Sequence, residues 1–250
     1  AKGESPLNLL LMEQIDKLYT KDPSLGSPSM LDELCGLGFR INHKRVERLM
    51  RLMAIASVQP GPHTSRKGKG EGHKVYPNLI KGIPIDQPDK VWCSDITYIP
   101  VEGGFFYLTA VMDWYSRYIL SWELCNSLDS EFCITVLEEA LRSHGKPEYF
   151  HTDQGSQYTS DDFTGILASN EINISMSGKG RCIDNVMVER FWRSLKYREV
   201  YLHRYENGDA AYEGISRFMT KYCTHYLHGS LNKRTPMEVY RQTALKCGQV

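Results

Sequence analysis

The chain has 250 residues, enough for one or two domains with buried cores, and its 41% hydrophobic and 24% charged residues exclude a wholly disordered protein. The 30 basic and 30 acidic side chains give a formal net charge of zero, which taken alone argues weakly against nucleic-acid binding. Apolar runs are short and no leader peptide opens the chain, so no membrane segment is expected, and seven scattered cysteines indicate reduced thiols rather than disulfides or a zinc site.

The first 58 residues predict three short helices. Apolar residues at helical spacing between residues 5 and 22 predict the first helix, and residues 29–35 predict the second. Asn42 is the expected N-cap of a third, basic helix. This order is typical of a helix-turn-helix, whose last helix lies in the major groove of DNA, although many helical hairpins share the pattern. The residues of the third helix that we expect to contact DNA are Lys44, Arg45, Arg48 and Arg51.

Positive charge is concentrated between residues 36 and 81. This segment holds ten Lys or Arg residues against two acids, a local charge of +8, so the rest of the chain carries the opposite charge. Residues 59–88 are rich in Pro and Gly and predict a linker whose basic side chains lie along a phosphate backbone. A solvated helix face with a plain linker is the alternative. The expected DNA contacts in the linker are Arg66, Lys67 and Lys69.

From residue 91 the pattern changes to β-strands. Alternating and apolar segments rich in β-branched and aromatic residues, separated by Gly and Pro turns, predict three strands in a meander. An amphipathic helix ending at Gly145 and a further strand follow, which indicates an α/β layout with a mixed sheet. The expected strands are residues 91–99, 105–112, 118–122 and 149–152, and the expected helix is residues 130–144.

Three acidic residues lie at positions in the predicted strands and helix that suggest a functional site. Asp95 lies inside the first strand, where an acid is costly unless function requires it. Asp153 follows the fourth strand, at the edge where open α/β sheets bind ligands. Glu189 lies on a helix that begins near residue 184, with Arg193 and Lys196 on the same face.

Three carboxylates without zinc-type ligands suit Mg²⁺ or Mn²⁺. Two such ions about 3.5–4 Å apart can clamp the attacking and leaving oxygens of a phosphoryl displacement. Asp95 would then bridge the two ions, and Asp153 and Glu189 would each hold one. Taken singly, each acid is also compatible with a helix cap or a surface salt bridge.

Other polar and aromatic residues favour structural roles. The four tryptophans, which could stack on bases, fit strand and helix patterns and are expected in the core. His151 is expected to be satisfied by backbone groups, and Asp113 to be structural with Arg117 as its partner. No serine has a visible histidine and acid partnership, so a serine nucleophile is not expected.

Four motifs resemble those of the aspartate-aspartate-glutamate transposases, and most closely the second-frame protein (OrfB) of the IS3 family of bacterial insertion sequences. The spacing of 35 residues between Asp153 and Glu189 is characteristic of that family. Its catalytic core is similar to retroviral integrase. The motifs are Trp92-Cys-Ser-Asp-Ile-Thr-Tyr98, Asp113-Trp-Tyr-Ser-Arg117, Thr152-Asp-Gln-Gly-Ser-Gln-Tyr158 and Gly178-Lys-Gly-Arg-Cys-Ile-Asp-Asn185.

The resemblance implies an RNase H-like, mixed five-stranded sheet with flanking helices over residues 89–205. A helix-turn-helix-like domain of residues 1–58 and the linker of residues 59–88 would precede it, and a helical tail of residues 206–250 would follow. The implied activity is metal-dependent DNA 3′-end cleavage and strand transfer, with Asp95, Asp153 and Glu189 as catalytic and metal-binding residues. Asn185, Arg193 and Lys196 would contact DNA near the site.

The same resemblance implies partners and a location. The chain would act on double-stranded DNA, at element ends and at the target, as a homo-oligomer and with a first-frame (OrfA) protein or fusion. It would work in the bacterial cytoplasm at the nucleoid, without a membrane.

The chain also departs from the family. Cys223 and Tyr226 stand where an asparagine and an arginine are usual, and Leu25, Pro28 and Ala54 replace other typical residues. These departures leave open a catalytically impaired DNA-binding remnant that holds element ends or represses transposition. A nuclease of RNase H type acting on branched or hybrid substrates is a third hypothesis.

Overall fold

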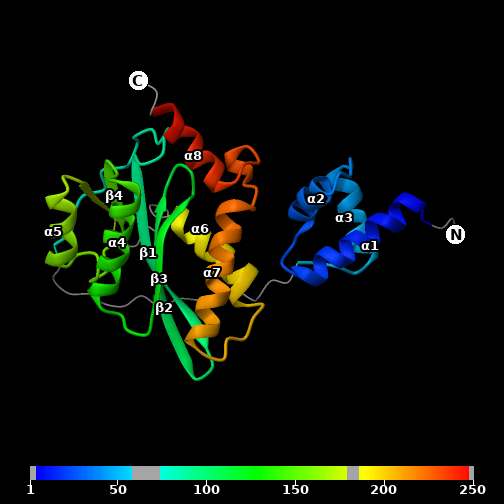
Figure 1. Cartoon of the computed structure of the whole chain (residues 1–250), viewed down its shortest axis with the longest axis horizontal. Helices are drawn as coiled ribbons and strands as arrows, with labels where there is room; N and C mark the ends of the chain where they lie inside the picture. Colours follow the sequence, from blue (N-terminus) through cyan, green and yellow to red (C-terminus); the bar gives the residue numbers. More distant parts are fainter. Residues whose placement is uncertain (1–3, 58–73, 179–185, 248–250) are drawn as a thin grey trace. The chain divides into compact units, whose positions relative to one another are not determined.

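The computed structural model describes residues 4–57, 74–178 and 186–247 of the chain (Figure 1). These belong to two compact units. One comprises Ala1–Thr64 with Lys196–His203, and the other comprises Ser65–Leu195 with Arg204–Val250. Within the described segments, no helix has the length and apolar character needed to cross a membrane.

The first unit is built on three helices, as the sequence predicts. They are α1 (Pro6–Lys21), α2 (Ser27–Gly36) and α3 (His43–Leu52). The side chain of Asn42 accepts a hydrogen bond from the backbone N–H of Arg45 at 2.9 Å, which confirms the predicted N-cap. The helices are held together by a fully buried apolar cluster of Leu11, Ile15, Met30, Leu34, Val46 and Leu49.

The second unit contains a five-stranded mixed sheet. Its strand order is β3-β2-β1-β4-β5; β1 and β2 pair antiparallel, as do β2 and β3, whereas β4 runs parallel to both β1 and β5. The two strands that carry or precede the candidate acids therefore lie side by side in the middle of the sheet. The strands are β1 (Val91–Val101), β2 (Gly104–Asp113), β3 (Ile119–Cys125), β4 (Tyr149–Thr152) and β5 (Asn173–Met176).

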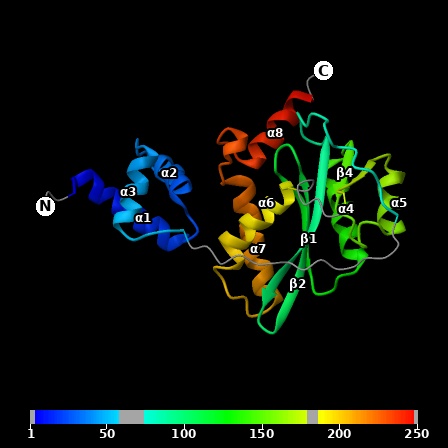
Figure 2. The same ribbon diagram turned by 180° about the vertical axis from the view of Figure 1, so that it is seen from behind.

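Helices cover both faces of this sheet, as Figures 1 and 2 show from opposite sides. One face packs against α4 (Ser130–His144) and α5 (Asp161–Ser169) around the buried Trp92 and Phe150. The bounds of α4 match the prediction, and Gly145 follows it at φ 84°, a conformation that favours glycine. The opposite face carries α6 (Val186–Leu195) and α7 (Gly208–Thr224). The fold class predicted from the sequence is confirmed.

Three further helical segments complete the second half of the chain. A five-residue π-helix, η2 (Lys196–Val200), follows α6, and a 3₁₀ turn, η3 (Gly229–Leu231), and α8 (Pro236–Cys247) follow α7. α7 buries Ile215, Phe218 and Tyr222. The C-terminal helices therefore contribute to the core.

The free edge of β5 is covered by an extended segment that precedes β1. The backbone N–H of Leu79 donates to Ser175 Oγ at 2.9 Å, and the backbone N–H of Met176 donates to the carbonyl of Pro77 at 3.3 Å. Cover of this kind satisfies the polar backbone groups of a sheet edge.

Candidate active site

Asp95 lies in the middle of β1 and faces the layer of α6. Its register partner on β2 is Ala110, and α6 packs against β1. The indole Nε1 of Trp192, on α6, donates a hydrogen bond to Asp95 Oδ2 at 3.1 Å. Trp192 is 5% exposed, so its expected place in the core is confirmed, but its contact with Asp95 was not predicted. The only local signal was its position three residues after Glu189.

The carboxyl group of Asp95 has a strongly perturbed affinity for protons. Its pKa is raised to about 7, chiefly by burial and next by the negative charge of Asp153, with a smaller contribution from Glu189. The backbone N–H of Ile96 and the indole of Trp192 act in the opposite direction. The three candidate acids, from β1, the loop after β4 and α6, therefore act on one another electrostatically.

Asp153 follows β4 directly and is fixed by its own loop. Its Oδ1 accepts a hydrogen bond from the backbone N–H of Gly155 at 2.9 Å. A Cβ atom on Gly155 would lie 3.0 Å from that same oxygen, so the turn needs a glycine to keep this close approach. Although the residue is exposed to solvent, partial desolvation of its carboxyl group raises the pKa of Asp153.

His151, two residues before Asp153, is held on the sheet by hydroxyl groups. Its Nδ1 lies 3.0 Å from Ser175 Oγ and its Nε2 lies 3.1 Å from Ser177 Oγ. The imidazole is satisfied, as expected, but these two partners are side-chain hydroxyls of β5 and the residue after it, where the sequence predicted backbone groups. These contacts of His151 help to fix the end of β4, which directly precedes Asp153.

Glu189 lies on the exposed face of α6. Phe191 and Leu195 are buried on the other face, and Arg193 is exposed like Glu189, which confirms the predicted faces of this helix. Desolvation raises the pKa of Glu189. The prediction that Lys196 continues the same α-helix is wrong, because α6 ends at Leu195 and a π-helical turn with a different period begins at Lys196.

Tyr158 ties the loop after Asp153 to the strand that carries Asp95. Its hydroxyl lies 3.0 Å from Ser94 Oγ and 3.2 Å from Thr109 Oγ1, and Thr109 in turn donates to the carbonyl of Asp95. The ring of Tyr158 is 2% exposed. This buried hydroxyl network couples the backbone positions of the two aspartates.

The donor set of this site fits a hard divalent cation. Carboxylate oxygens are the ligands that Mg²⁺ and Mn²⁺ prefer, and a bound cation would offset the charge repulsion that contributes to the raised pKa of Asp95. Among the residues with a described position, no three His, Cys, Asp or Glu side chains are gathered closely enough to hold a metal ion together. The residues that would hold such an ion are Asp95, Asp153 and Glu189.

Asp113, in the turn after β2, does not have the side-chain partner that the sequence predicted. Asp113 is fully buried, and its carboxylate accepts hydrogen bonds from the backbone N–H and hydroxyl of Ser116 and from the backbone N–H of Asp89. Arg117 gives Asp113 only a backbone N–H, to its carbonyl oxygen at 2.9 Å. The predicted side-chain pair between Asp113 and Arg117 is therefore wrong, because three nearer donors already satisfy the carboxylate.

In the helical unit, two of the four predicted DNA contacts on α3 are paired with acids. The guanidinium of Arg48 donates to both carboxylate oxygens of Glu4, at 2.7 and 2.8 Å, and Arg51 pairs with Glu47 at 3.2 Å. Lys44 and Arg45 are exposed. The sequence gave no sign of the Glu4 contact, because 44 residues separate the two partners.

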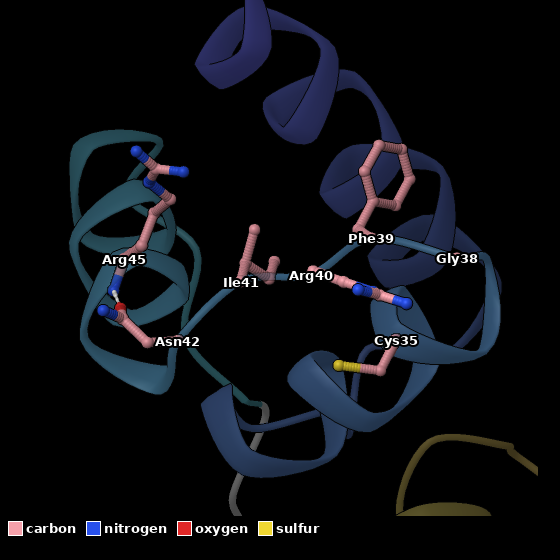
Figure 3. Close-up of a pocket in the computed structure, with 7 residues that line it drawn as sticks. All are labelled: Cys35, Gly38, Phe39, Arg40, Ile41, Asn42 and Arg45. Atoms are coloured by element: carbon pink, nitrogen blue, oxygen red, sulfur yellow. Dashed lines mark hydrogen bonds between the residues drawn. The ribbon is translucent and has the colours of Figure 1, made fainter.

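A pocket of about 750 Å³ opens beside the N-terminus of α3 (Figure 3). Arg45 reaches it from α3, and Arg40 reaches it from the segment between α2 and α3. Gly38, at φ 91°, turns the chain there. Arg40 was not among the predicted DNA contacts, although it lies in the basic segment of the sequence.

Four predicted DNA contacts, Arg66, Lys67, Lys69 and Asn185, lie outside the described residues. Of the tryptophans, Trp92 is fully buried, whereas Trp114 and Trp122 are half-buried. The five cysteines whose side chains are described, Cys35, Cys93, Cys125, Cys133 and Cys223, are free thiols.

Family models and known proteins resemble this chain over most of its length. Two models described as "Integrase core domain" match residues 85–182 and 170–236, and one described as "HTH-like domain" matches residues 6–63. The transposase for insertion sequence element IS904 of Lactococcus lactis is 32% identical over 237 residues, which is 92% of either chain. The transposase InsF for insertion sequence IS3A of Escherichia coli is 32% identical over 68% of this chain and 60% of its own length.

Solved structures share the fold. The chain in the cryo-EM structure of the simian T-cell lymphotropic virus intasome, solved with the PP2A regulatory subunit B56 gamma, superposes with a TM-score of 0.55. The match covers 90% of this chain and 74% of the other at 17% sequence identity. At this identity the likeness concerns the fold alone.

Proposed function

The chain belongs to the transposases of IS3-family insertion sequences, and hence to the polynucleotidyl transferases, and we propose that Asp95, Asp153 and Glu189 are its catalytic residues. With them the chain cleaves the 3′ ends of its element and joins them to target DNA. The observation that supports this assignment is that the negative charges of Asp153 and Glu189 both raise the pKa of Asp95, which indicates that the three carboxyl groups lie within electrostatic range of one another.

Mg²⁺ or Mn²⁺, and two ions rather than one, is the proposed cofactor. When bound, such ions polarise the phosphodiester and stabilise the charge that develops during displacement. Asp95, Asp153 and Glu189 would supply the oxygen ligands. Their negative charge, which is unfavourable in isolation, is what the cation would neutralise.

The protein's own part is to hold the three carboxylates in place. Trp192 orients Asp95 by its indole N–H, and the backbone N–H of Gly155 orients Asp153. Glu189 is carried by a helix whose other face is anchored in the core by Phe191 and Leu195. Water and then a DNA 3′-hydroxyl would be the nucleophiles, so no side chain needs to form a covalent intermediate.

The departures from the family pattern are accommodated inside the fold. Tyr226 is 9% exposed, and its ring packs against Phe218 and Tyr222 at centroid distances of 5.9 and 6.3 Å. Cys223 and Leu25 are also buried. Tyr226, Cys223 and Leu25 therefore pack within the fold, and the activity test below decides between the catalytic assignment and the impaired-remnant alternative.

The helical unit is proposed to bind the element ends. Its exposed cations beside α3, Lys44, Arg45 and Arg40, suit phosphate contacts. Joining two element ends to one target calls for more than one copy of the chain on DNA. A first-frame (OrfA) partner or fusion is also part of this proposal.

The test of the catalytic assignment is nicking of supercoiled plasmid in Mn²⁺ by the full chain. We expect Glu189→Gln, which keeps the shape of the side chain but removes its charge, to lose nicking by at least about 100-fold, because one cation ligand is gone. The matched control is Glu138→Gln on the exposed face of α4, which packs on the opposite face of the sheet. Equal nicking by Glu189→Gln and Glu138→Gln would disprove the assignment.

A further inference from the structure

A second polar pocket lies in the core unit, next to α6. Its volume is about 280 Å³, which is small beside typical ligand cavities of roughly 300–1,000 Å³, so it admits part of a strand and not a duplex. We call it the Arg117 pocket. The lining residues that matter here are Trp114, Tyr115, Arg117, Ser230, Asn232 and Arg234.

Arg117 brings an uncompensated positive charge to this pocket. Its Nε atom is buried and has no hydrogen-bond partner in the described part of the chain. Burial lowers the pKa of Arg117, Tyr222 acts in the opposite direction, and the nearby charge of Arg190 lowers it as well. The one acid of the same turn, Asp113, is already occupied by Ser116 and the backbone of Asp89.

Arg234 is held at the pocket by neutral groups. Its Nε donates to the carbonyl of Leu231 at 3.2 Å and its Nη1 donates to Gln242 Oε1 at 2.9 Å. These contacts fix the planar guanidinium without neutralising it. The exposed side chains of Ser230 and Asn232 add a hydroxyl and an amide, and none of the lining residues is acidic.

The lining residues of the pocket are connected to the elements that carry the candidate acids. The ring of Trp114 packs edge-on against His151 at a centroid distance of 5.9 Å, and His151 precedes Asp153 by two residues. Met187, which also lines the pocket, precedes Glu189 by two residues on α6. The pocket is thus attached to two of the elements that carry the candidate acids.

We propose that the Arg117 pocket binds a phosphodiester group of the DNA strand whose end is processed at Asp95, Asp153 and Glu189, with an adjacent base lying against Trp114 or Tyr115. Guanidinium groups match phosphate oxygens in bidentate geometry, and aromatic faces accept any base. A peptide carboxylate would use the cations but not the aromatic wall beside them. This inference rests on the proposed function, because it places the strand by the catalytic acids.

The first test is DNA binding by Ser230→Glu, which places a negative charge at the exposed rim of the pocket. The probe is a short duplex of random sequence with a single-stranded overhang, measured by fluorescence anisotropy without divalent metal over a series of salt concentrations. We expect the dissociation constant to rise about fivefold or more, and the slope of log K against log salt to fall by roughly one. The matched control is Thr135→Glu on the exposed face of α4, with equal thermal midpoints required of both variants.

The second test locates the base. An overhang that contains 5-iodouracil is irradiated in complex with the wild-type full chain, and the crosslinked peptides are identified by mass spectrometry. We expect a crosslink at Trp114 or Tyr115. Crosslinks confined to the helical unit, together with equal binding by Ser230→Glu and Thr135→Glu, would overturn the proposal.

The outcomes separate this proposal from the catalytic one. If the wild-type chain nicks plasmid in the Glu189-dependent manner but Ser230→Glu binds like its control, only the pocket assignment fails. If the wild-type chain neither binds nor nicks DNA, the proposed function itself fails. If Ser230→Glu changes self-association in the absence of DNA and leaves DNA affinity unchanged, the pocket is a contact for a second copy and the proposal is wrong.

Discussion

At the scale of single residues, the contact between Trp192 and Asp95 is the least expected feature of the site. Asp95 is half-buried in a strand of largely buried residues, where desolvation makes an ionised carboxylate costly without a donor. The indole N–H supplies one from 97 residues further along the chain. A donor of this kind favours one orientation of the carboxylate.

Removing this hydrogen-bond donor is expected to weaken metal binding at the site while leaving the protein folded. Trp192→Phe keeps a ring in the core but removes the N–H, and loss of an outer hydrogen bond to a metal ligand typically costs about 10–100-fold in metal affinity or activity. We expect the Mn²⁺ concentration for half-maximal nicking to rise by roughly tenfold. The control is Trp122→Phe, whose ring packs on Tyr212. An unchanged Mn²⁺ requirement in Trp192→Phe would refute this role.

The pair of Glu4 and Arg48 makes a prediction about pH. The hydrogen bonds from Arg48 and Asn8 lower the pKa of Glu4 from 4.5 to about 2. Because the folded pKa lies below the unfolded value, the stabilisation is present above about pH 4.5 and is lost as the pH falls toward 2.

Glu4→Gln should therefore lower the unfolding temperature of the helical unit at pH 7, and the difference from wild type should shrink as the pH falls below about 4.5. Calorimetry of the full chain at several pH values measures this. Glu13→Gln, which breaks an exposed pair with Lys17 on α1, is the matched control. A difference for Glu4→Gln that does not change with pH would contradict the assignment.

At the scale of elements, the loop after β4 owes its position to Tyr158. This side chain is the point at which the motif from Thr152 to Tyr158 enters the core, between Ser94 of β1 and Thr109 of β2. The loop that carries Asp153 is consequently attached to the strand that carries Asp95.

We expect Tyr158→Phe to destabilise the fold by about 0.5–1.5 kcal/mol, because it removes a buried hydroxyl that contacts both Ser94 and Thr109. Since the ring remains, the variant should stay folded, and nicking should fall more than the stability loss alone explains. Urea unfolding and plasmid nicking measured side by side test this. Tyr212→Phe, on the exposed face of α7, is the control. Nicking equal to that of the control would show that the loop does not depend on this hydroxyl.

The elements themselves were largely predictable, because their signals are local. The period of apolar residues and the capping residues predicted α4 and β4 to the residue, and Asn42 marked the start of α3. What failed depends on geometry that no local pattern contains. Examples are the change to a π-helix at Lys196 and the choice of Ser116 over Arg117 by Asp113.

The candidate site was likewise predictable only where the signal is local in the sequence. The three acids stand out in the sequence because each interrupts an apolar pattern or follows a strand. Their supports, such as Trp192 for Asp95 and Ser175 for His151, come from distant parts of the chain. The Arg117 pocket joins a β-turn to a segment more than 100 residues away, so only the folded chain reveals it.

At the scale of the whole molecule, the net charge is zero, but positive and negative charge are concentrated in different parts of the sequence. The basic segment between residues 36 and 81 carries +8, and four of its cations, Lys44, Arg45, Arg48 and Arg51, lie on α3 in the helical unit. The rest of the chain carries the compensating charge of −8, and it includes the candidate catalytic acids, with Asp95 on β1, Asp153 in the loop after β4 and Glu189 on α6. Within this acidic part of the sequence, the Arg117 pocket brings two arginines together.

The extended segment at Pro77 and Leu79 has a further consequence for the second unit. By occupying the edge of β5, it removes a surface on which another polypeptide would add a strand. A shortened chain that begins at Val91 would retain every strand and helix of the core but expose this edge. Such a fragment would be prone to intermolecular β-pairing and aggregation, so a stable isolated core must begin upstream of Pro77.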